Sequence, residues 1–174
     1  HDQIIGPKYN FVLDHPVRFE NHLKQTPQHL TILTPDRNYA AFAETFYPVK
    51  ARFLPPGGIE ASDQLDKERI YDVTFIATYN DISTDIFKEI HNLEPAMRFL
   101  INRLWIIMRR NPTLTAEDAL SRALLYYGKN LEDAEFLSLF QNLQPYILYM
   151  VNRYRCKVLE TLLNAGIKVD VYGK

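Results

Sequence analysis

The stretch YNFVLDHP, residues 9–16, passes from an apolar run into a polar cluster within one residue. Two later stretches do the same: ILTPDR at 32–37 and VTFIATYND at 73–81. This pattern is typical of buried strands in an open α/β sheet whose carboxyl ends border a binding crevice. We therefore expect any chemistry of this protein to lie at these three strand ends.

Around the first two stretches, short strands alternate with short helices. We expect strands at 9–14, 29–34 and 51–54, and a helix over 38–46 that Asp36 caps and Pro48 ends. The following segment is rich in Pro, Gly and charge and has no apolar periodicity, which is typical of a linker. The expected organisation is a first lobe, a linker and a second lobe, with bounds at 1–58, 59–70 and 71–174.

The second lobe is expected to begin with a strand at 71–77 and to end with one at 167–172. Between them, apolar residues recur every three or four positions, which predicts helices. Capping residues delimit the later ones at 116–127, 131–142 and 145–164. Strand, helices and strand form a right-handed crossover, so the two strands should pair in parallel. The predicted fold class is α/β, with Rossmann-like three-layer segments, mainly parallel strands and a large helical insert in the second lobe.

The bulk composition narrows the classes of function. The 174 residues are 47% hydrophobic, and 20 Lys and Arg balance 21 Asp and Glu, for a net charge of −1. A balanced charge gives no electrostatic support for a nucleic-acid partner. No apolar run is long enough to span a membrane.

The single cysteine, Cys156, rules out an intramolecular disulfide and fits a reducing cytoplasm. Because the chain opens on His1 and closes on a strand-like segment, we expect a piece of a longer protein.

Asp14 and His15 are the candidate catalytic residues. A carboxylate and an imidazole at the mouth of a sheet can act as a general base toward a hydroxyl. The alternative is that Asp14 caps the following turn, His15 is exposed and Pro16 fixes the bend. Nearby, Arg37 can grip a phosphate or a carboxylate, unless Asp36 caps a helix and Arg37 is solvated.

Thr78, Tyr79 and Asn80 are candidates for binding an anion. Their hydroxyl and amide groups follow a strand and precede a helix, where a phosphate can bind. The alternative is an ordinary turn between strand and helix. Arg155, on the last predicted helix, can also point at an anion, or it can be solvated. No metal site is indicated, because the five histidines form no H-x-x-x-H pattern.

Six short motifs, in order, carry a resemblance to a known family: LDHP at 13–16, DR at 36–37, FLPPGG at 53–58, RIYDVTFIATY at 69–79, YR at 154–155 and LNAGIKVDVYG at 163–173. Together they resemble the CgeB-like (spore maturation protein) glycosyltransferase family, over nearly the whole chain. The resemblance implies the GT-B architecture, in which two Rossmann-like lobes face a cleft. It also implies that the family's sequence continues beyond Gly173, so this chain would be an internal fragment that is inactive by itself.

The resemblance implies transfer of a sugar from a nucleotide-sugar donor to a hydroxyl acceptor, which can be a glycan, a protein or a small molecule. Asp14 and His15 would then serve the acceptor side, and Thr78, Tyr79, Asn80 and Arg155 the donor side. No further cofactor is implied, and the oligomeric state stays open. Two alternatives remain at this point: a non-catalytic carbohydrate-recognition or protein-interaction module, and a nucleotide-binding regulatory domain.

Overall fold

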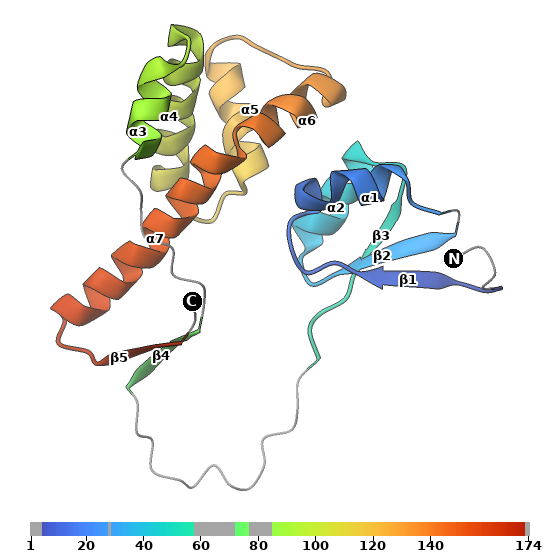
Figure 1. Ribbon diagram of the computed structural model, residues 1–174, viewed down its shortest axis with the longest axis horizontal. Helices are drawn as coiled ribbons and strands as arrows, with labels where there is room; N and C mark the ends of the chain where they lie inside the picture. Colours follow the sequence, from blue (N-terminus) through green and yellow to red (C-terminus); the bar gives the residue numbers. More distant parts are fainter. Residues whose placement is uncertain (1–4, 28, 58–71, 77–84, 173–174) are drawn as a thin grey trace, which may run out of the picture. The chain divides into compact units, whose positions relative to one another are not determined.

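The computed structural model describes the chain in four segments, which are 5–27, 29–57, 72–76 and 85–172. The chain divides into two compact units (Figure 1). The first unit holds His1–Glu60 together with Glu132–Leu137, and the second holds Ala61–Leu131 together with Ser138–Lys174. The predicted linker at 59–70 lies outside the described residues.

The first unit is built on a three-stranded sheet in the order β1-β2-β3. The strands are β1 (Lys8–Phe11), β2 (Leu30–Thr34) and β3 (Lys50–Phe53), within the ranges or one residue of those predicted. Both pairings are parallel, and Phe11, Leu33 and Arg52 lie side by side in the register. Because all three strands run the same way, their carboxyl ends share one edge of the sheet.

Short helical elements lie on one side of this sheet (Figure 1): η1 (Pro16–Phe19), α1 (Glu20–Lys24) and α2 (Arg37–Phe46). The predicted helix over 38–46 is confirmed as α2. Asp36 caps it, since its Oδ1 accepts a hydrogen bond of 2.7 Å from the Asn38 N–H. Apolar side chains from the strands and from these elements form the core of the unit, among them Val12, Val17, Leu23, Ile32, Phe42, Ala43 and Ala51.

The opposite face of the sheet is open within the described residues of this unit. Tyr9 and Phe11 on β1 are 63% and 46% exposed. The register places them beside Thr31 and Leu33, and then beside Lys50 and Arg52. Parallel sheets usually have helices on both faces. Here the described residues form two layers, one of strands and one of helical elements.

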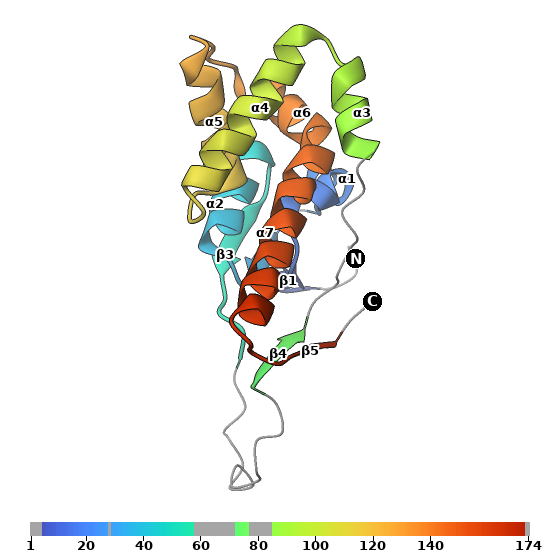
Figure 2. The same ribbon diagram turned by 90° about the vertical axis from the view of Figure 1, so that its left-hand side faces the viewer.

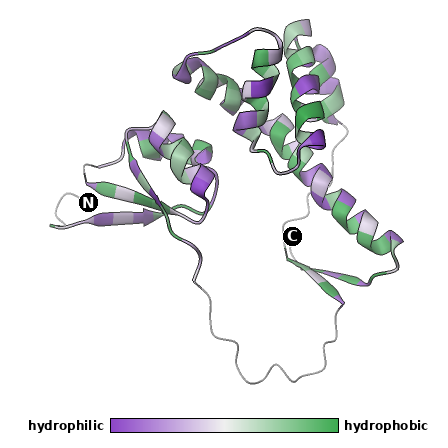
Figure 3. Cartoon of the chain, turned by 180° about the vertical axis from the view of Figure 1, so that it is seen from behind, coloured by the Kyte–Doolittle hydropathy of each residue, from purple (hydrophilic) through white to green (hydrophobic). Residues whose placement is uncertain are grey.

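The second unit is mainly helical, with α3 (Asp85–Asn92), α4 (Pro95–Arg110), α5 (Ala116–Tyr126) and α7 (Gln144–Asn164). α6 (Asp133–Asn142) contributes residues to both units. Figure 3 shows hydrophobic and hydrophilic residues alternating along these helices, as expected for helices with one buried side. The core of the second unit is formed by Leu100, Ile101, Leu104, Ala119, Leu120, Ala123, Phe140, Leu143 and Ile147.

The predicted ends of the later helices are confirmed closely. α5 begins at Thr115, whose Oγ1 accepts a hydrogen bond of 3.1 Å from the Asp118 N–H. After α5 and α7 come Gly128 and Gly166, with φ of 65° and 75°. Only glycine adopts this left-handed conformation without a steric cost, so both glycines end their helices as the sequence predicts.

A two-stranded parallel sheet closes the second unit. β4 (Val73–Ile76) pairs with β5 (Val169–Tyr172), with Val73 beside Val169 and Ile76 beside Tyr172. The predicted parallel pairing is confirmed. Figure 2 shows α7 leading directly to β5, and Cys156 and Leu159 are buried in the half of α7 that precedes this strand. The chain therefore has an α/β fold with a large helical segment between two parallel strands.

The structure also bears on membrane insertion. No described helix combines the length and the hydropathy that crossing a bilayer requires.

Candidate functional site

The carboxyl edge of the first sheet gathers polar side chains from two neighbouring strand ends. Asp14 and His15 follow β1, and Asp36 and Arg37 follow β2. Phe53 is the last residue of β3. Since the three strands are parallel neighbours, these residues lie along one edge, as the sequence predicts.

His15 is held by contacts on two sides. Its Nδ1 accepts a hydrogen bond of 3.2 Å from the Val17 N–H, so the imidazole caps η1. Its ring meets Tyr39 and Phe42 edge to face, at centroid distances of 4.9 and 4.6 Å. The side chain is half-buried as a result. The expectation that Asp14 caps this turn is wrong, because the imidazole of the next residue occupies that position.

Asp14 is exposed to solvent at the same edge. Within the described segments, no hydrogen bond or ion pair engages its carboxylate. A carboxylate in this state keeps its lone pairs available, so it can accept a proton from a hydroxyl group that binds beside it.

Arg37 extends the site toward β3. Its guanidinium lies 4.5 Å from the centroid of the Phe53 ring, in a cation–π contact. Both side chains are exposed. Asp36 is used as a helix cap, as the alternative interpretation predicts, while Arg37 is stacked on an aromatic ring rather than simply solvated. The edge therefore presents a cation fixed on a planar surface beside the Asp14–His15 pair.

The predicted donor-side residues Thr78, Tyr79 and Asn80 lie outside the described residues. Arg155 is on α7 in the second unit, and its side chain is exposed. Next to it, burial raises the pKa of the Tyr154 hydroxyl above its ordinary value, and the cationic Arg109 opposes the rise. The described residues thus locate one of the four donor-side candidates.

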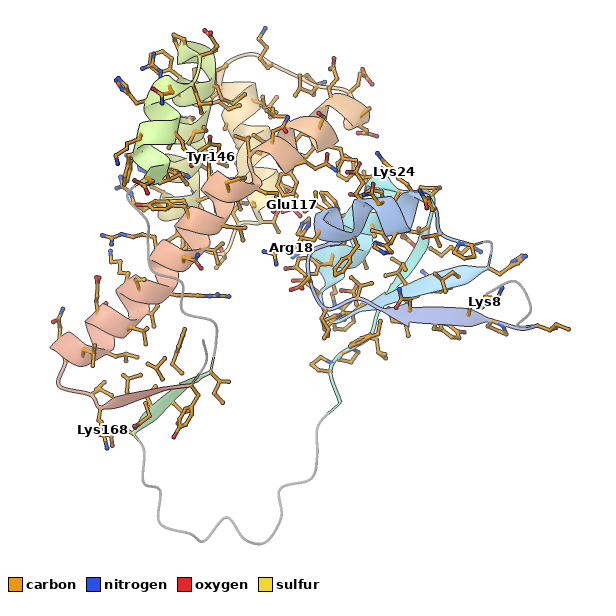
Figure 4. All side chains as sticks on the ribbon, in the orientation of Figure 1. Lys8, Arg18, Lys24, Glu117, Tyr146 and Lys168 are labelled. Atoms are coloured by element: carbon orange, nitrogen blue, oxygen red, sulfur yellow. The ribbon has the colours of Figure 1, made fainter. Side chains whose placement is uncertain are left out.

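The amino edge of the first sheet holds a hollow of about 870 Å³ that the sequence interpretation missed. This is the edge at which β1 begins at Lys8, which Figure 4 labels. A proline precedes each strand here: Pro7, Pro27 and Pro48. All three line the hollow, with His29, Thr31, Glu44, Tyr47 and Lys50 among the other lining residues. The recurrence of a proline before each strand is the sequence signal that could have indicated this hollow.

His29 also stands out for its backbone, with φ of 67°. A residue other than glycine adopts this left-handed conformation infrequently. The Glu44 carboxylate at the same edge accepts a hydrogen bond of 3.0 Å from the Ala51 N–H, so it ties α2 to β3. The sequence interpretation predicted neither of these two features.

An aromatic cluster on α4 and α5 of the second unit was likewise missed. The Arg103 guanidinium lies 3.6 Å from the centroid of the Tyr126 ring. The Tyr127 hydroxyl donates a hydrogen bond of 3.3 Å to the carbonyl of Phe99. Phe99 and Tyr126 are 62% and 61% exposed. We call Phe99, Arg103, Tyr126 and Tyr127 the α4–α5 cluster.

The described residues contain no group of three or more His, Cys, Asp or Glu side chains placed to hold a metal ion. No protein-family model, curated protein or solved structure matches this chain.

Proposed function

We propose that this chain is part of a glycosyltransferase that moves a sugar from a nucleotide-sugar donor to a hydroxyl acceptor. The observation that supports the proposal most is the shared carboxyl edge of the first sheet, where Asp14 and His15 follow β1 and Arg37 follows the neighbouring β2. Ligands of open α/β sheets bind at such edges. The proposal includes a three-layer, Rossmann-like arrangement of each lobe, with a further layer over the open face of the first sheet.

The proposed reaction requires one proton transfer, the formation of one bond and the cleavage of another. An acceptor hydroxyl loses its proton to a carboxylate, its oxygen forms a bond to the anomeric carbon, and the bond from that carbon to the diphosphate breaks. The diphosphate leaves with the electron pair of that bond, and cationic and amide groups stabilise it. Asp14 and His15 serve the acceptor side in the first unit. Thr78, Tyr79, Asn80 and Arg155 serve the donor side.

Ligand-induced stabilisation tests the proposal directly. A nucleotide sugar present at a hundred times its Kd stabilises the native state by about 2.7 kcal/mol. For a chain of this length, that corresponds to a rise in Tm of about 5–10 °C. We expect at least one of UDP, GDP, dTDP and their sugars to produce such a rise. If none shifts the Tm of this chain or of a longer protein that contains it, the glycosyltransferase proposal is wrong.

The Asp14→Asn variant tests the catalytic assignment. An amide cannot take the acceptor proton, so the turnover of a longer protein that contains this chain should fall by about 10²–10⁴-fold. The exposed position of Asp14 predicts little change in Tm. Asp72→Asn is the matched control, because Asp72 is also exposed and lies in the second unit. Full turnover in Asp14→Asn would remove Asp14 from the mechanism.

One observation favours a second candidate, a protein-interaction module. A surplus of exposed apolar residues on the helices around 136–149 would favour this candidate, but Phe140, Leu143 and Tyr146 there are buried, and Leu148 is 37% exposed. The α4–α5 cluster is exposed instead, and it combines aromatic residues with arginine, the residue types that are enriched at binding hot spots. Nucleotide binding without sugar transfer would instead indicate the third candidate, a regulatory domain.

A further inference from the structure

We propose that the hollow at the amino edge of the first sheet, the amino-edge hollow, binds an anionic sugar, a small molecule that carries a phosphate or a carboxylate together with hydroxyl groups. This site goes beyond the proposed function, because none of its residues belongs to the donor side or the acceptor side of that proposal. The five residues of β2 separate it from the carboxyl edge by about 13 Å, since each strand residue adds about 3.3 Å.

The amino-edge hollow has the size and the mixed lining of a small-molecule site. Its volume of about 870 Å³ is within the range of about 300–1,000 Å³ that is common for such sites. Every residue that lines it belongs to the first unit. Part of the lining is apolar and offers a surface for the carbon–hydrogen groups of a sugar ring; it is formed by Pro7, Pro27, Leu30, Pro48 and Val49.

Two nitrogen-bearing side chains of the lining are available to an anion. Lys50 and His29 are both exposed to solvent. Among the described residues, neither side chain makes a hydrogen bond or an ion pair. The ammonium of Lys50 has three N–H donors, and an imidazole has at least one in either protonation state. A phosphate or a carboxylate can accept from both, and hydrogen bonds to an ionised group are the stronger kind.

The backbone of His29 supports a role in binding. Its φ of 67° is in the left-handed region, which is sterically unfavourable for a residue that has a side chain. Residues held in such conformations are concentrated at functional sites. The contact of His29 with β1 is made by its backbone, since its carbonyl accepts a hydrogen bond of 3.4 Å from the Lys8 N–H. The fold therefore does not require an imidazole at this position.

Glu44 distinguishes a sugar from a simple anion. Its Oε1 accepts a hydrogen bond of 3.0 Å from the Ala51 N–H, which holds the carboxylate at the hollow. The negative charge repels every anion. A carboxylate accepts several hydrogen bonds, so a ligand whose hydroxyls donate to it compensates for this repulsion. The hydroxyl of Thr31, which has no hydrogen bond among the described residues, is a second partner for such a ligand.

Nuclear magnetic resonance titrations of this chain test the site. We expect glucose 6-phosphate and glucuronate to shift the amide resonances of His29, Thr31 and Lys50 and to saturate, with a Kd of about 1 mM or lower. The tighter of the two identifies the anionic group that the site prefers. Glucose lacks the charge and inorganic phosphate lacks the hydroxyl groups of a sugar, so each should bind at least about 10-fold more weakly.

Two results of these titrations would overturn the inference. One is the absence of shifts at His29, Thr31 and Lys50 with both anionic sugars at about 20 mM. The other is inorganic phosphate that binds as tightly as glucose 6-phosphate, because the hydroxyl groups would then contribute nothing.

Lys50→Gln tests the contact with the anion. Lys8→Gln is the matched control, because Lys8 is likewise the first residue of a strand at this edge, labelled in Figure 4, and is not one of the residues that line the hollow. We expect Lys50→Gln to raise the Kd of glucose 6-phosphate by about 10-fold, the effect of one lost hydrogen bond to a charged group. Lys8→Gln should change it by less than about 2-fold, since water and salt screen a more distant charge. Equal effects of the two variants would contradict a specific site.

His29→Gly separates binding from folding. Glycine adopts a φ of 67° without a steric cost, so the Tm should not fall. We expect the Kd of glucose 6-phosphate to rise by about 3–10-fold, because the imidazole N–H is lost. A lower Tm together with unchanged binding would assign the imidazole to the fold instead and overturn the inference.

Glu44→Gln tests the selection of hydroxyl groups. The amide oxygen can still accept from the Ala51 N–H, but the negative charge is lost. We expect inorganic phosphate to bind more tightly, so that its Kd falls from about 10 times that of glucose 6-phosphate to about 3 times or less. An unchanged ratio would contradict the assignment to a sugar. None of these measurements uses a nucleotide sugar or turnover, so failure of the proposed function would leave their outcome unaffected.

Discussion

The two units of this protein form their cores in different ways. In the first unit, each strand pairs with the next one along the chain, and the core side chains come from these strands and the helical elements between them, with one distant segment, Glu132–Leu137, added to the unit. In the second unit, β4 pairs with β5 across the whole helical segment. Local sequence patterns can therefore predict most core residues of the first unit, whereas the core of the second unit depends on contacts between distant segments.

The largest expected effect tests whether the two cores are separate. Leu104 is 0% exposed in the second unit, and Ile32 is 2% exposed in the first. Replacing either by Ala should lower the free energy of unfolding by about 2–5 kcal/mol.

The chain has a single tryptophan, Trp105, so its fluorescence reports on the second unit. We expect Leu104→Ala to lower the fluorescence-detected Tm by about 5–15 °C, and Ile32→Ala to leave it unchanged. Equal shifts from both variants would show that the units unfold together, and the comparison would fail.

A smaller effect is expected from removing one helix cap in each unit. Thr115 caps α5 in the second unit and Asp36 caps α2 in the first. Thr115→Ala and Asp36→Ala should each cost about 1 kcal/mol, because each leaves an N–H at the start of a helix without its partner. Amide hydrogen exchange should show faster exchange only in the unit that carries the substitution. Thr115→Ser and Asp36→Asn keep a capping oxygen and are the controls.

The smallest expected effect is a difference at alkaline pH. Burial, and then the charge of Glu89, raise the pKa of the Tyr146 hydroxyl, and burial also raises that of Tyr154. Figure 4 labels Tyr146 on α7 of the second unit. A pKa that is higher in the folded state means that the folded state holds its proton more tightly. This contribution to stability is complete below about pH 10, the ordinary value, and is lost as the pH rises through the folded value.

We therefore expect the fluorescence-detected Tm of the second unit to fall as the pH rises above about 10. The double variant Tyr146→Phe and Tyr154→Phe should reduce the slope of Tm against pH, because neither ring can then ionise. An unchanged slope in that variant would show that these two hydroxyls do not contribute to it.

Several elements could be predicted because their signals are local. α2 begins where Asp36 offers its carboxylate to a backbone N–H, and α7 ends before Gly166. The parallel pairing of β4 with β5 followed from the handedness of crossovers. The position of Asp14 and Arg37 at one edge of the sheet could also be predicted, because strands that alternate with helices run parallel and so have their carboxyl ends at the same edge.

Other features depend on contacts that the sequence does not display. His15 was expected to be either a base or an exposed residue, and its capping role appears only when the turn closes around Val17. Tyr126 on α5 is 61% exposed and lies against the guanidinium of Arg103 on α4, a contact between two helices. The hollow at the amino edge arises from three separate strand entries. Each of these features depends either on residues that are distant in sequence or on a local backbone geometry. The spacing of apolar residues along the chain reveals neither of these.

The separation of β4 from β5 along the chain also affects how the protein is made. A ribosome that adds about 5–20 residues per second needs on the order of 5–20 s to pass from one strand to the other. Throughout that interval β4 has left the ribosome without the strand that it pairs with, Val169–Tyr172, and its backbone hydrogen-bonding groups have no partner in β5. Nascent chains of this protein should therefore engage chaperones that hold extended segments, and slower translation of the helical segment should prolong that engagement.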